Sequence, residues 1–492
     1  MKKTILISPN DSAAVALAPL KKGEEAEGVT LAEDVEKGHK FALRDIKTGE
    51  HIIKYGNVIG KATADIKAGE HIHTHNMATN LSGTLEYSYN KKEIPDLSGF
   101  KTRMVNVFER PNGEVGIRNE LWIIPTVGCV NSQARLIAAE FLKKHGELKG
   151  IDGVFAYTHP YGCSQIGEDH ERTRMILQRM VKHPNCGGAL VLGLGCENNR
   201  MDIFKETLGN YNKERTEFLI AQDVEDEIAE GVKLLEKLYE AAKNDKRVEK
   251  DLSCLKVGLK CGGSDGLSGI TANPLVGRFS DYMAGIGGTT VLTEVPEMFG
   301  AEQLLMDRAK DEETFNKIVK LVNGFKEYYQ KHDQPVYENP SPGNKAGGIT
   351  TLEDKSLGCT QKSGAGAVCD VLFDGDALSA HGLNLLNGPG NDMVAVTNLA
   401  SAGCHMVLFT TGRGTPFGGF VPTIKISTNS DLAKRKTNWI DFNAGGIAEG
   451  ETFEAKLEQL VDLIVETANG KQTVNERYNS RDIAIFKTGV TL

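Results

Sequence analysis

Three of the twelve histidines lie at alternate positions, His71, His73 and His75. In a β-strand such residues point to one face, because successive side chains alternate between the two faces. Imidazoles gathered on one face can bind a divalent metal ion or a carboxylate. We predict that His73 and His75 are metal ligands, although an exposed polar strand would show the same pattern. His39 and Lys40 follow an earlier glycine turn and are candidates for the same surface.

A Gly-Cys pair recurs after apolar stretches of the chain. It places Cys129, Cys163 and Cys196 after three such stretches, and Cys261 follows a fourth in a variant of the pattern. Ligands of open parallel sheets bind at the carboxyl ends of the strands, so these thiols could meet in one crevice. Thiolates there could bind a soft metal ion or an iron–sulfur cluster. The alternative is that they are small apolar residues at tight turns.

Polar stretches supply further groups that could hold a hydroxy acid. Arg118 and Lys345 suit a carboxylate, and His170 suits proton transfer. No nucleotide-binding motif is present, because Gly193 and Gly195 are not followed by the third glycine of the dinucleotide fingerprint. A phosphate-binding Gly-Lys-Ser/Thr loop is also missing. Hydride transfer and phosphoryl transfer are therefore disfavoured.

The composition narrows the class of protein further. The net charge of the 492 residues is −9, without the clustered Lys and Arg that nucleic-acid binding requires. No convincing signal peptide is present, and no apolar run approaches the ~18 residues of a membrane span. We expect a cytoplasmic protein that binds neither nucleic acid nor membrane. Nine cysteines are too few, and odd in number, for a disulfide framework. The oligomeric state, a homo-oligomer included, stays open.

Three parts of the chain must position these groups. In residues 1–88 a turn of the form Asp-Val/Ile-x-x-Gly recurs and ends at Gly38, Gly49 and Gly69, which predicts a small β-rich domain. Residues 105–245 and 255–492 alternate apolar strands with amphipathic helices, which predicts an α/β fold with parallel sheets. Glycine becomes frequent after about residue 335, which predicts ordered loops and short strands. Residues 89–104 and 243–251 are predicted linkers.

The individual elements follow from the hydrophobic pattern. The predicted strands are residues 121–126, 153–157, 189–192, 217–221, 255–259 and 289–293, and the predicted helices are residues 132–144, 172–181, 225–242 and 274–284.

Several longer motifs are typical of one enzyme family. They include Arg118-Asn-Glu-Leu-Trp122 and Tyr161-Gly-Cys-Ser-Gln165, and they continue through residues 38–43, 69–76, 195–199, 261–274, 293–300, 341–348, 352–356 and 486–492. On these motifs the chain resembles the altronate and galactarate dehydratase family over nearly its whole length, and the altronate type most closely. Residues 1–88 resemble the SAF domain, a small β-clip. The resemblance thus implies a SAF domain followed by α/β domains and a Gly-rich C-terminal region.

The resemblance also implies a chemistry. It implies a hydro-lyase that removes water from D-altronate to give 2-keto-3-deoxy-D-gluconate in hexuronate breakdown, with ferrous iron or manganese as the metal. The metal would stabilise the enediolate, a base would take the C2 proton, and an acid would protonate the C3 hydroxyl. We assign base, acid and carboxylate contacts to His39, Lys40, Arg118, His170 and Lys345. We expect the site between the small domain and the sheet domains.

Three alternatives remain open at this level. The substrate could be galactarate or another hydroxy acid of the same family. An iron–sulfur cluster on Cys129, Cys163, Cys196 and Cys261 could act on the departing hydroxyl instead of a single metal ion. The protein could also be a non-catalytic sugar-acid binding protein, which predicts ligand binding without turnover.

Overall fold

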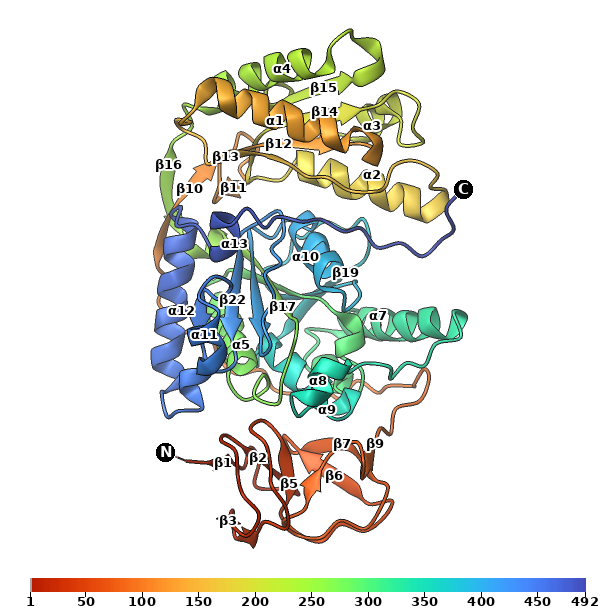
Figure 1. Cartoon of the computed structure of the whole chain (residues 1–492), viewed down its shortest axis with the longest axis vertical. Coiled ribbons are helices and arrows are strands. Elements are labelled where there is room, and N and C mark those ends of the chain that lie inside the picture. The colour runs from red at the N-terminus through yellow and green to blue at the C-terminus, as the bar shows by residue number, and fades with distance from the viewer. Residues whose placement is uncertain (1) are drawn as a thin grey trace.

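The computed structural model describes residues 2–492 and arranges them as three stacked parts, an N-terminal domain, a C-terminal domain and a second domain (Figure 1). The C-terminal domain lies in the middle, although it comes last in the chain. No helix within residues 2–492 is both long and apolar enough to cross a lipid bilayer. The predicted α/β class, with a small β-rich N-terminal domain, is confirmed.

The N-terminal domain is built from short antiparallel strands around repeated turns. Gly38, Gly49 and Gly69 have φ angles of 86°, 84° and 85°, the left-handed conformation that glycine adopts without strain. Asp45 and Asp65 exchange contacts across the repeat: each accepts from a backbone N–H and a lysine of the other's turn. The strands are β1 (Thr4–Ile5), β2 (Ala13–Ala16), β3 (Glu25–Ala26), β4 (Val29–Thr30), β5 (Lys40–Ala42), β6 (His51–Lys54), β7 (Asn57–Ala62), β8 (His71–Ile72) and β9 (Met77–Ala78).

The second domain is a four-stranded parallel sheet in the order β13-β12-β14-β15. The predicted strands and helices are confirmed, with shifts at their ends, and α3 is an addition that the hydrophobic pattern did not predict. One apolar cluster joins the sheet to α1 and α4, and another joins it to α2, α3 and the C-terminal domain. The elements are β12 (Glu120–Pro125), α1 (Asn131–His145), β13 (Gly153–Ala156), α2 (Gly167–Val181), β14 (Cys186–Gly193), α3 (Met201–Thr207), β15 (Thr216–Ile220) and α4 (Glu227–Ala242).

The chain crosses twice between the second and C-terminal domains, and the crossings pair with each other. Strand β10 (Met104–Glu109) lies antiparallel to β16 (Arg247–Asp251) and to β11 (Val115–Gly116). The prediction that residues 243–251 form a linker is therefore wrong for most of that stretch. A polar strand carries little hydrophobic signal, and β16 is stabilised by backbone pairing with residues far away in the chain.

The C-terminal domain holds a seven-stranded, fully parallel sheet in the order β19-β20-β18-β17-β21-β22-β23. More regular structure follows residue 335 than the glycine content predicted. The strands are β17 (Lys256–Cys261), β18 (Thr289–Leu292), β19 (Val368–Leu372), β20 (Gly382–Leu386), β21 (Met406–Thr411), β22 (Thr423–Ser427) and β23 (Phe442–Asn443). The helices are α5 (Ala272–Gly285), α6 (Glu302–Met306), α7 (Glu312–Lys331), α8 (Pro342–Ala346), α9 (Leu352–Cys359), α10 (Asp392–Ser401), α11 (Ser430–Arg435), α12 (Phe453–Ala468) and α13 (Val474–Arg477).

Strand β17 is the topological switch point of this sheet. The chain proceeds from β17 to β18 on one side and later to β21 on the other side. Ligands of open α/β sheets bind outside the carboxyl end of the strand at such a point. Here that end is Cys261, and the loops that follow it face the N-terminal domain.

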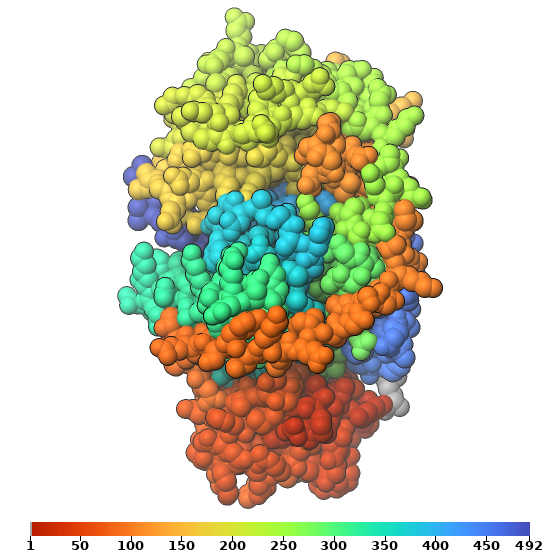
Figure 2. Space-filling model, turned by 180° about the vertical axis from the view of Figure 1, so that it is seen from behind, coloured from red at the N-terminus to blue at the C-terminus, as the bar shows by residue number. Residues whose placement is uncertain are grey.

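The N-terminal domain packs on these loops through backbone contacts. A Cβ atom on Gly266 would lie 1.9 Å from the carbonyl oxygen of Gly38, and one on Gly348 would lie 2.3 Å from the same oxygen. From the other side of the molecule, the segment after the N-terminal domain runs as an orange band across the C-terminal domain (Figure 2). Tyr89 of this segment stacks on Phe315 of α7, with ring centroids 5.1 Å apart. These contacts fix the position of the N-terminal domain on the C-terminal domain.

Gly266→Ala should disturb this contact, because the neighbouring atom is backbone and cannot rotate away. We expect a loss of about 1–3 kcal/mol in the free energy of unfolding, measured by chemical denaturation. The control is Gly324→Ala in α7, where an added Cβ meets nothing within 4 Å. It should leave stability unchanged or raise it by up to ~1 kcal/mol. Equal effects of the two substitutions would contradict the close contact.

Candidate active site between the N-terminal and C-terminal domains

A cluster of imidazoles lies where the N-terminal domain meets α8. The rings of His39, His71 and His73 have centroids 5.1, 5.2 and 5.6 Å apart. Nδ1 of His39 lies 3.0 Å from Nε2 of His71. The C-terminal domain completes the cluster, since Nε2 of His39 contacts the carbonyl oxygen of Ala346 at 3.4 Å and Nδ1 of His73 contacts the hydroxyl of Thr350 at 2.8 Å. The structure thus brings His39 and His73 together, as the sequence pattern proposed.

These imidazoles are held neutral by their surroundings. Burial, followed by the neighbouring imidazoles, lowers the pKa of His71 to about 3. Burial, followed by the charge of Lys40, lowers the pKa of His73 to about 4. Burial also lowers the pKa of His39. A neutral imidazole keeps a lone pair that can accept a proton or bind a metal ion.

The predicted strand through all three alternating histidines is wrong. Strand β8 ends at Ile72, and the carbonyl oxygen of His73 accepts from the backbone N–H groups of Asn76 and Met77, which closes a turn. His75 stands in this turn as an exposed residue, with its ring 5.6 Å from that of His71. Its role as a metal ligand stays a prediction.

Beneath the imidazoles, Asp354 of α9 lies between two lysines of the N-terminal domain. Its carboxylate accepts from Lys40 and from Lys54, each at 3.0 Å, and all three side chains are at most 2% exposed. Burial raises the pKa of Asp354, but the two lysines outweigh it and hold that pKa well below its usual range. Burial lowers the pKa of Lys40 to about 8, against the opposing pull of Asp354. Lys40 also donates to the hydroxyl of Thr350 at 2.6 Å.

Lys345 lies beside the cluster on α8. Its backbone carbonyl contacts the ring of His73, and the next residue, Ala346, contacts His39. The side chain is half-buried, and its ammonium forms no ion pair within residues 2–492. An unpaired ammonium on a residue whose backbone contacts the imidazoles suits the carboxylate of a substrate.

A second cluster, fully buried, lies at the carboxyl end of β17. Sγ of Cys261 and Sγ of Cys359 lie 3.4 Å apart, and each lies 3.1 Å from the same carboxylate oxygen of Glu297. These three donor atoms are spaced closely enough to hold one metal ion. Lys362 donates to Cys261 at 2.9 Å, and Lys355 pairs with Glu297 at 2.7 Å. Cys261 was predicted as an alternative ligand, whereas Glu297 and Cys359 were not.

The buried cluster has an unequal charge distribution. The hydrogen bond from Cys359, with help from Lys362, lowers the pKa of Cys261 to about 6. The same hydrogen bond and burial raise the pKa of Cys359. Burial opposes the charge of Glu297, but the two lysines lower its pKa to about 2. The two lysines therefore favour negative charge in this group, and Cys261 ionises more readily than Cys359.

Glu294, which follows β18, has a strained backbone beside the buried cluster. Its φ of 70° is a left-handed conformation that is rare for a side chain of this size. It is buried, accepts from the backbone N–H of Cys261 at 2.9 Å and pairs with Lys260 at 3.1 Å. Backbone strain of this kind concentrates at functional sites.

Helix α9 connects the two clusters. Asp354 faces the N-terminal domain, whereas Lys355 and Cys359 reach the buried cluster. A cavity of about 10 Å³, room for one water molecule, is lined by Asp354 and Cys359 together with Lys54 and Asp265.

Arg118 and His170 do not join either cluster. Arg118 gives all five of its N–H donors to protein acceptors: the carboxylate of Glu476 and three backbone carbonyls. It therefore has no donor left for a substrate and serves instead to hold the last helix, α13, against the second domain. His170 lies on α2 of the second domain, and its catalytic role stays a prediction.

The four predicted thiols do not share one crevice. Cys261 ends a strand of the C-terminal sheet, whereas Cys129, Cys163 and Cys196 follow strands of the second-domain sheet. The prediction that all four converge is therefore wrong, because one hydrophobic pattern recurs in two separate sheets.

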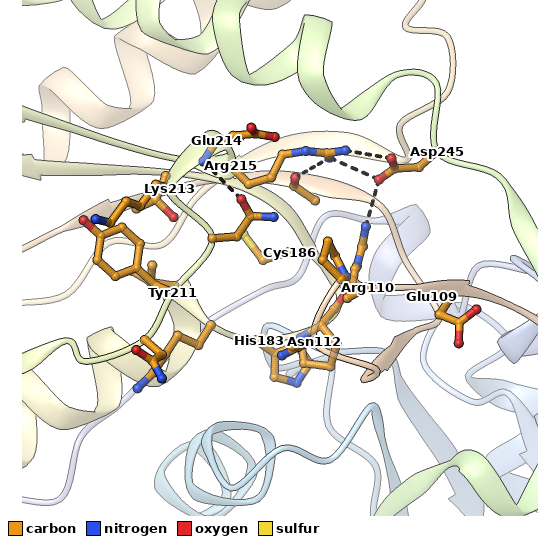
Figure 3. A pocket seen from close by; sticks show the side chains of 18 of the residues that line it. Glu109, Arg110, Asn112, His183, Cys186, Tyr211, Lys213, Glu214, Arg215 and Asp245 are labelled. Atoms are coloured by element: carbon orange, nitrogen blue, oxygen red, sulfur yellow. Dashed lines mark hydrogen bonds and ion pairs between the residues drawn. The ribbon is translucent and has the colours of Figure 1, made fainter.

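A larger cavity, of about 1000 Å³, lies elsewhere, at the base of the second domain. Figure 3 shows Arg110 and Arg215 turned toward the same Asp245 carboxylate. The contacts from these arginines to Asp245 are 2.9 and 2.7 Å, so both guanidinium groups are held by the same carboxylate. His183, which also lines this cavity, has its pKa lowered by burial to about 3. The cavity is roomy, but Asp245 holds both arginines in place, and the imidazole cluster does not line it.

Comparison with known proteins agrees with the three-part architecture. Residues 2–80 match the model of the altronate/galactarate dehydratase SAF domain, residues 107–243 match the D-galactarate dehydratase/altronate hydrolase second domain, and residues 252–491 match the D-galactarate/altronate dehydratase C-terminal domain. The chain belongs to the altronate/galactarate dehydratase family. The resemblance found in the motifs is confirmed.

Relatives within this family align over nearly all of the chain. The altronate dehydratase of Escherichia coli K12 is 60% identical over 493 residues, which cover 99% of each chain. The altronate dehydratase of Bacillus subtilis 168 is 54% identical and covers 100% of each chain. The L-threo-forming galactarate dehydratase of E. coli K12 is 32% identical, with 94% of this chain and 91% of the relative covered.

Replacement of Asp354 tests the junction of the two domains. Asp354→Asn leaves two buried lysines without their carboxylate, so we expect the free energy of unfolding to fall by about 3–5 kcal/mol. The matched control is Asp65→Asn, which removes an exposed carboxylate that also pairs with a lysine, Lys47, at 2.8 Å. Surface pairs contribute little, so denaturation of this variant should resemble that of the parent. A parent-like Asp354→Asn would show that the buried pair does not hold the domains together.

The depressed histidine pKa values predict a pH dependence of stability. Below pH 6.5 the unfolded chain binds protons at His71, whereas the folded chain resists them until about pH 3. The parent should therefore lose unfolding free energy as the pH falls from 6.5 toward 4. His71→Gln, which carries no titrating group there, should lose less over that range. Parallel curves for the two proteins, measured by urea denaturation at each pH, would contradict the shift.

Proposed function

We propose that this protein is an altronate dehydratase, a hydro-lyase that converts D-altronate into 2-keto-3-deoxy-D-gluconate and water. The observation that carries the proposal is the set of neutral imidazoles beside α8, the helix that carries Lys345. The two full-length relatives named altronate dehydratase support the same substrate, since they are 60% and 54% identical. Galactarate is the second candidate substrate, supported by the more distant 32% relative.

The hydrogen bonds assign a proton acceptor. The carbonyl oxygen of Ala346 only accepts, so Nε2 of His39 carries the proton in the neutral ring. Nδ1 of His39 therefore accepts from Nε2 of His71. Nδ1 of His71 is then the free acceptor. We propose His71 as the base that takes the C2 proton, with His39 as the residue that orients it.

The same reasoning assigns a proton donor. The ammonium of Lys40 donates to the hydroxyl of Thr350, and we assign that hydroxyl as the donor to Nδ1 of His73. The other ring nitrogen of His73 therefore carries a proton. We propose that this proton goes to the departing C3 hydroxyl, while Thr350 and Lys40 resupply the ring. A Lys40 pKa of about 8 suits this supply, because the ammonium gives up its proton readily near neutral pH.

Ferrous iron, which the family resemblance implies, fits one donor set in this chain. Cys261, Glu297 and Cys359 would hold it, because their donor atoms lie 3.1–3.4 Å apart and thiolates suit this metal. Lys362 keeps Cys261 in the thiolate form that a metal requires. When bound, the ion supplies Lewis-acid stabilisation of negative charge. His73, proposed earlier as a ligand, has Nδ1 engaged by Thr350, so only its Nε2 could bind a metal ion, and this role stays a prediction.

Anaerobic turnover of purified protein with ferrous iron tests the proposal. We expect 2-keto-3-deoxy acid from D-altronate at a rate at least about tenfold above that from galactarate. His71→Ala should lower kcat by about 10²–10⁴-fold, the usual contribution of a general base. His51→Ala, which removes an exposed histidine of the same domain, is the control and should keep parent activity.

Two results would contradict the proposal. Binding of D-altronate without turnover, with or without metal, would favour a sugar-acid binding protein. Parent-like activity of His71→Ala would exclude the base assignment. Cys359→Ala separates the metal from the base, since it should lower bound iron while the imidazoles stay in place.

A further inference from the structure

Three cysteines of the second domain differ from all others in exposure. Within residues 2–492 nine cysteines are free, and the exposed ones are Cys129, Cys163 and Cys196. Free cysteine is among the residues most often buried, so three exposed thiols in one domain are unusual. They lie outside both clusters of the proposed active site, and nothing in the proposed reaction uses them.

The fold brings these thiols to one corner. Each follows the carboxyl end of a strand, and the strands β13, β12 and β14 are adjacent and parallel. Strand β12 is the switch point of this sheet, because the chain passes from it to β13 on one side and then to β14 on the other. A ligand of an open α/β sheet is expected at this edge.

Hydrogen bonds tie the three loops to one another. The backbone N–H of Gly128, next to Cys129, donates to the carbonyl of Tyr161 at 2.9 Å. The carbonyl of Gly162, next to Cys163, accepts from the backbone N–H of Asn199 at 3.0 Å. The backbone N–H of Ser164 donates to the side chain of Asn198 at 2.7 Å. The thiols are therefore carried by loops in direct contact.

The backbone around the thiols is closely packed and strained. A Cβ on Gly162 would lie 2.0 Å from the carbonyl oxygen of Thr126, so only glycine fits there. Ser164 has a φ of 56°, a left-handed conformation, and its carbonyl accepts from the backbone N–H of Leu492 at 3.0 Å. Glu197 accepts from two backbone N–H groups of its own loop and from the hydroxyl of Thr126. Strain that is held in place by so many contacts is typical of a ligand site.

A single metal ion and an iron–sulfur cluster require different distances between their thiolate ligands. A single tetrahedral ion with bonds of ~2.3 Å would need its thiolates about 4 Å apart. Within residues 2–492 the set of three donor atoms within 4.8 Å of one another is the buried Cys261–Glu297–Cys359 group, and it does not include these thiols. An iron–sulfur cluster spaces its thiolates further apart, because each binds a different iron.

We propose that Cys129, Cys163 and Cys196 bind a [4Fe–4S] cluster, with three thiolates on three of its irons. Helix α1 begins two residues after Cys129 and α2 begins four residues after Cys163, so their N-terminal N–H groups favour the anionic cluster. Loading is a ligand exchange: each protein thiol passes its proton to a departing small thiolate, and no electron is transferred. The fourth iron keeps an exchangeable ligand.

Transfer of a preformed cluster tests this assignment. The full-length protein is mixed anaerobically with a [4Fe–4S] complex of a small thiol, and unbound complex is removed by gel filtration. We expect the protein to turn brown and to retain iron and acid-labile sulfide in equal amounts. Cys129→Ser/Cys163→Ser/Cys196→Ser should retain less than about a tenth of the parent's sulfide. Because these side chains are exposed, its thermal unfolding should match that of the parent.

The matched control is Cys254→Ser/Cys369→Ser, which removes two half-buried cysteines outside the corner and should load like the parent. Parent protein that takes up no sulfide, or iron without sulfide, would overturn the proposal. Equal loading of the triple variant and the parent would also overturn it, because the cluster would then be bound by other residues. The readout does not depend on dehydratase activity, so failure of the proposed function leaves this result interpretable.

Discussion

The arrangement of the proposed active site depends on one buried carboxylate. Asp354 lies between Lys40 and Lys54, and these three side chains are at most 2% exposed. Buried charges are costly unless paired, so the N-terminal domain can dock only where both lysines meet this carboxylate. An apolar contact would tolerate sliding, whereas a bidentate ionic contact does not. The imidazoles of His39, His71 and His73 are placed against α8 as a consequence.

Helix α9 links the position of the imidazole cluster to that of the buried cluster. Its Asp354 orients the module that carries the proton-transferring groups, and its Cys359 completes the buried group with Cys261 and Glu297. The lysines around that group favour negative charge on its buried thiol and carboxylate groups. The buried group lies at the carboxyl end of β17, the switch point of the sheet. Open parallel sheets commonly bind their ligands at this position.

The sequence predicts the local elements well and the long-range contacts poorly. Apolar runs located β12, β13, β14 and β15, and recurring glycines located the turns of the N-terminal domain, because both signals are short in range. Strand β16 was not predicted, because its polar residues are ordered by pairing with β10 and carry no hydrophobic pattern. The turn after Ile72 also overrides the alternation of the histidines, so His75 is exposed at the edge of the cluster, beside His71. Cys359 was not predicted as a ligand, because it ends a helix and not a strand. The partners of Arg118 and Lys40 lie 358 and 314 residues away, a separation that no periodicity reports.

A structure of the protein with D-altronate, or an unreactive analogue of it, bound would test the central claim most directly. The account predicts that the ligand lies at the junction of the N-terminal and C-terminal domains, with its carboxylate at Lys345 and its C2 atom at Nδ1 of His71. A ligand found in the cavity beside Arg110 and Asp245, with the junction unchanged, would contradict it.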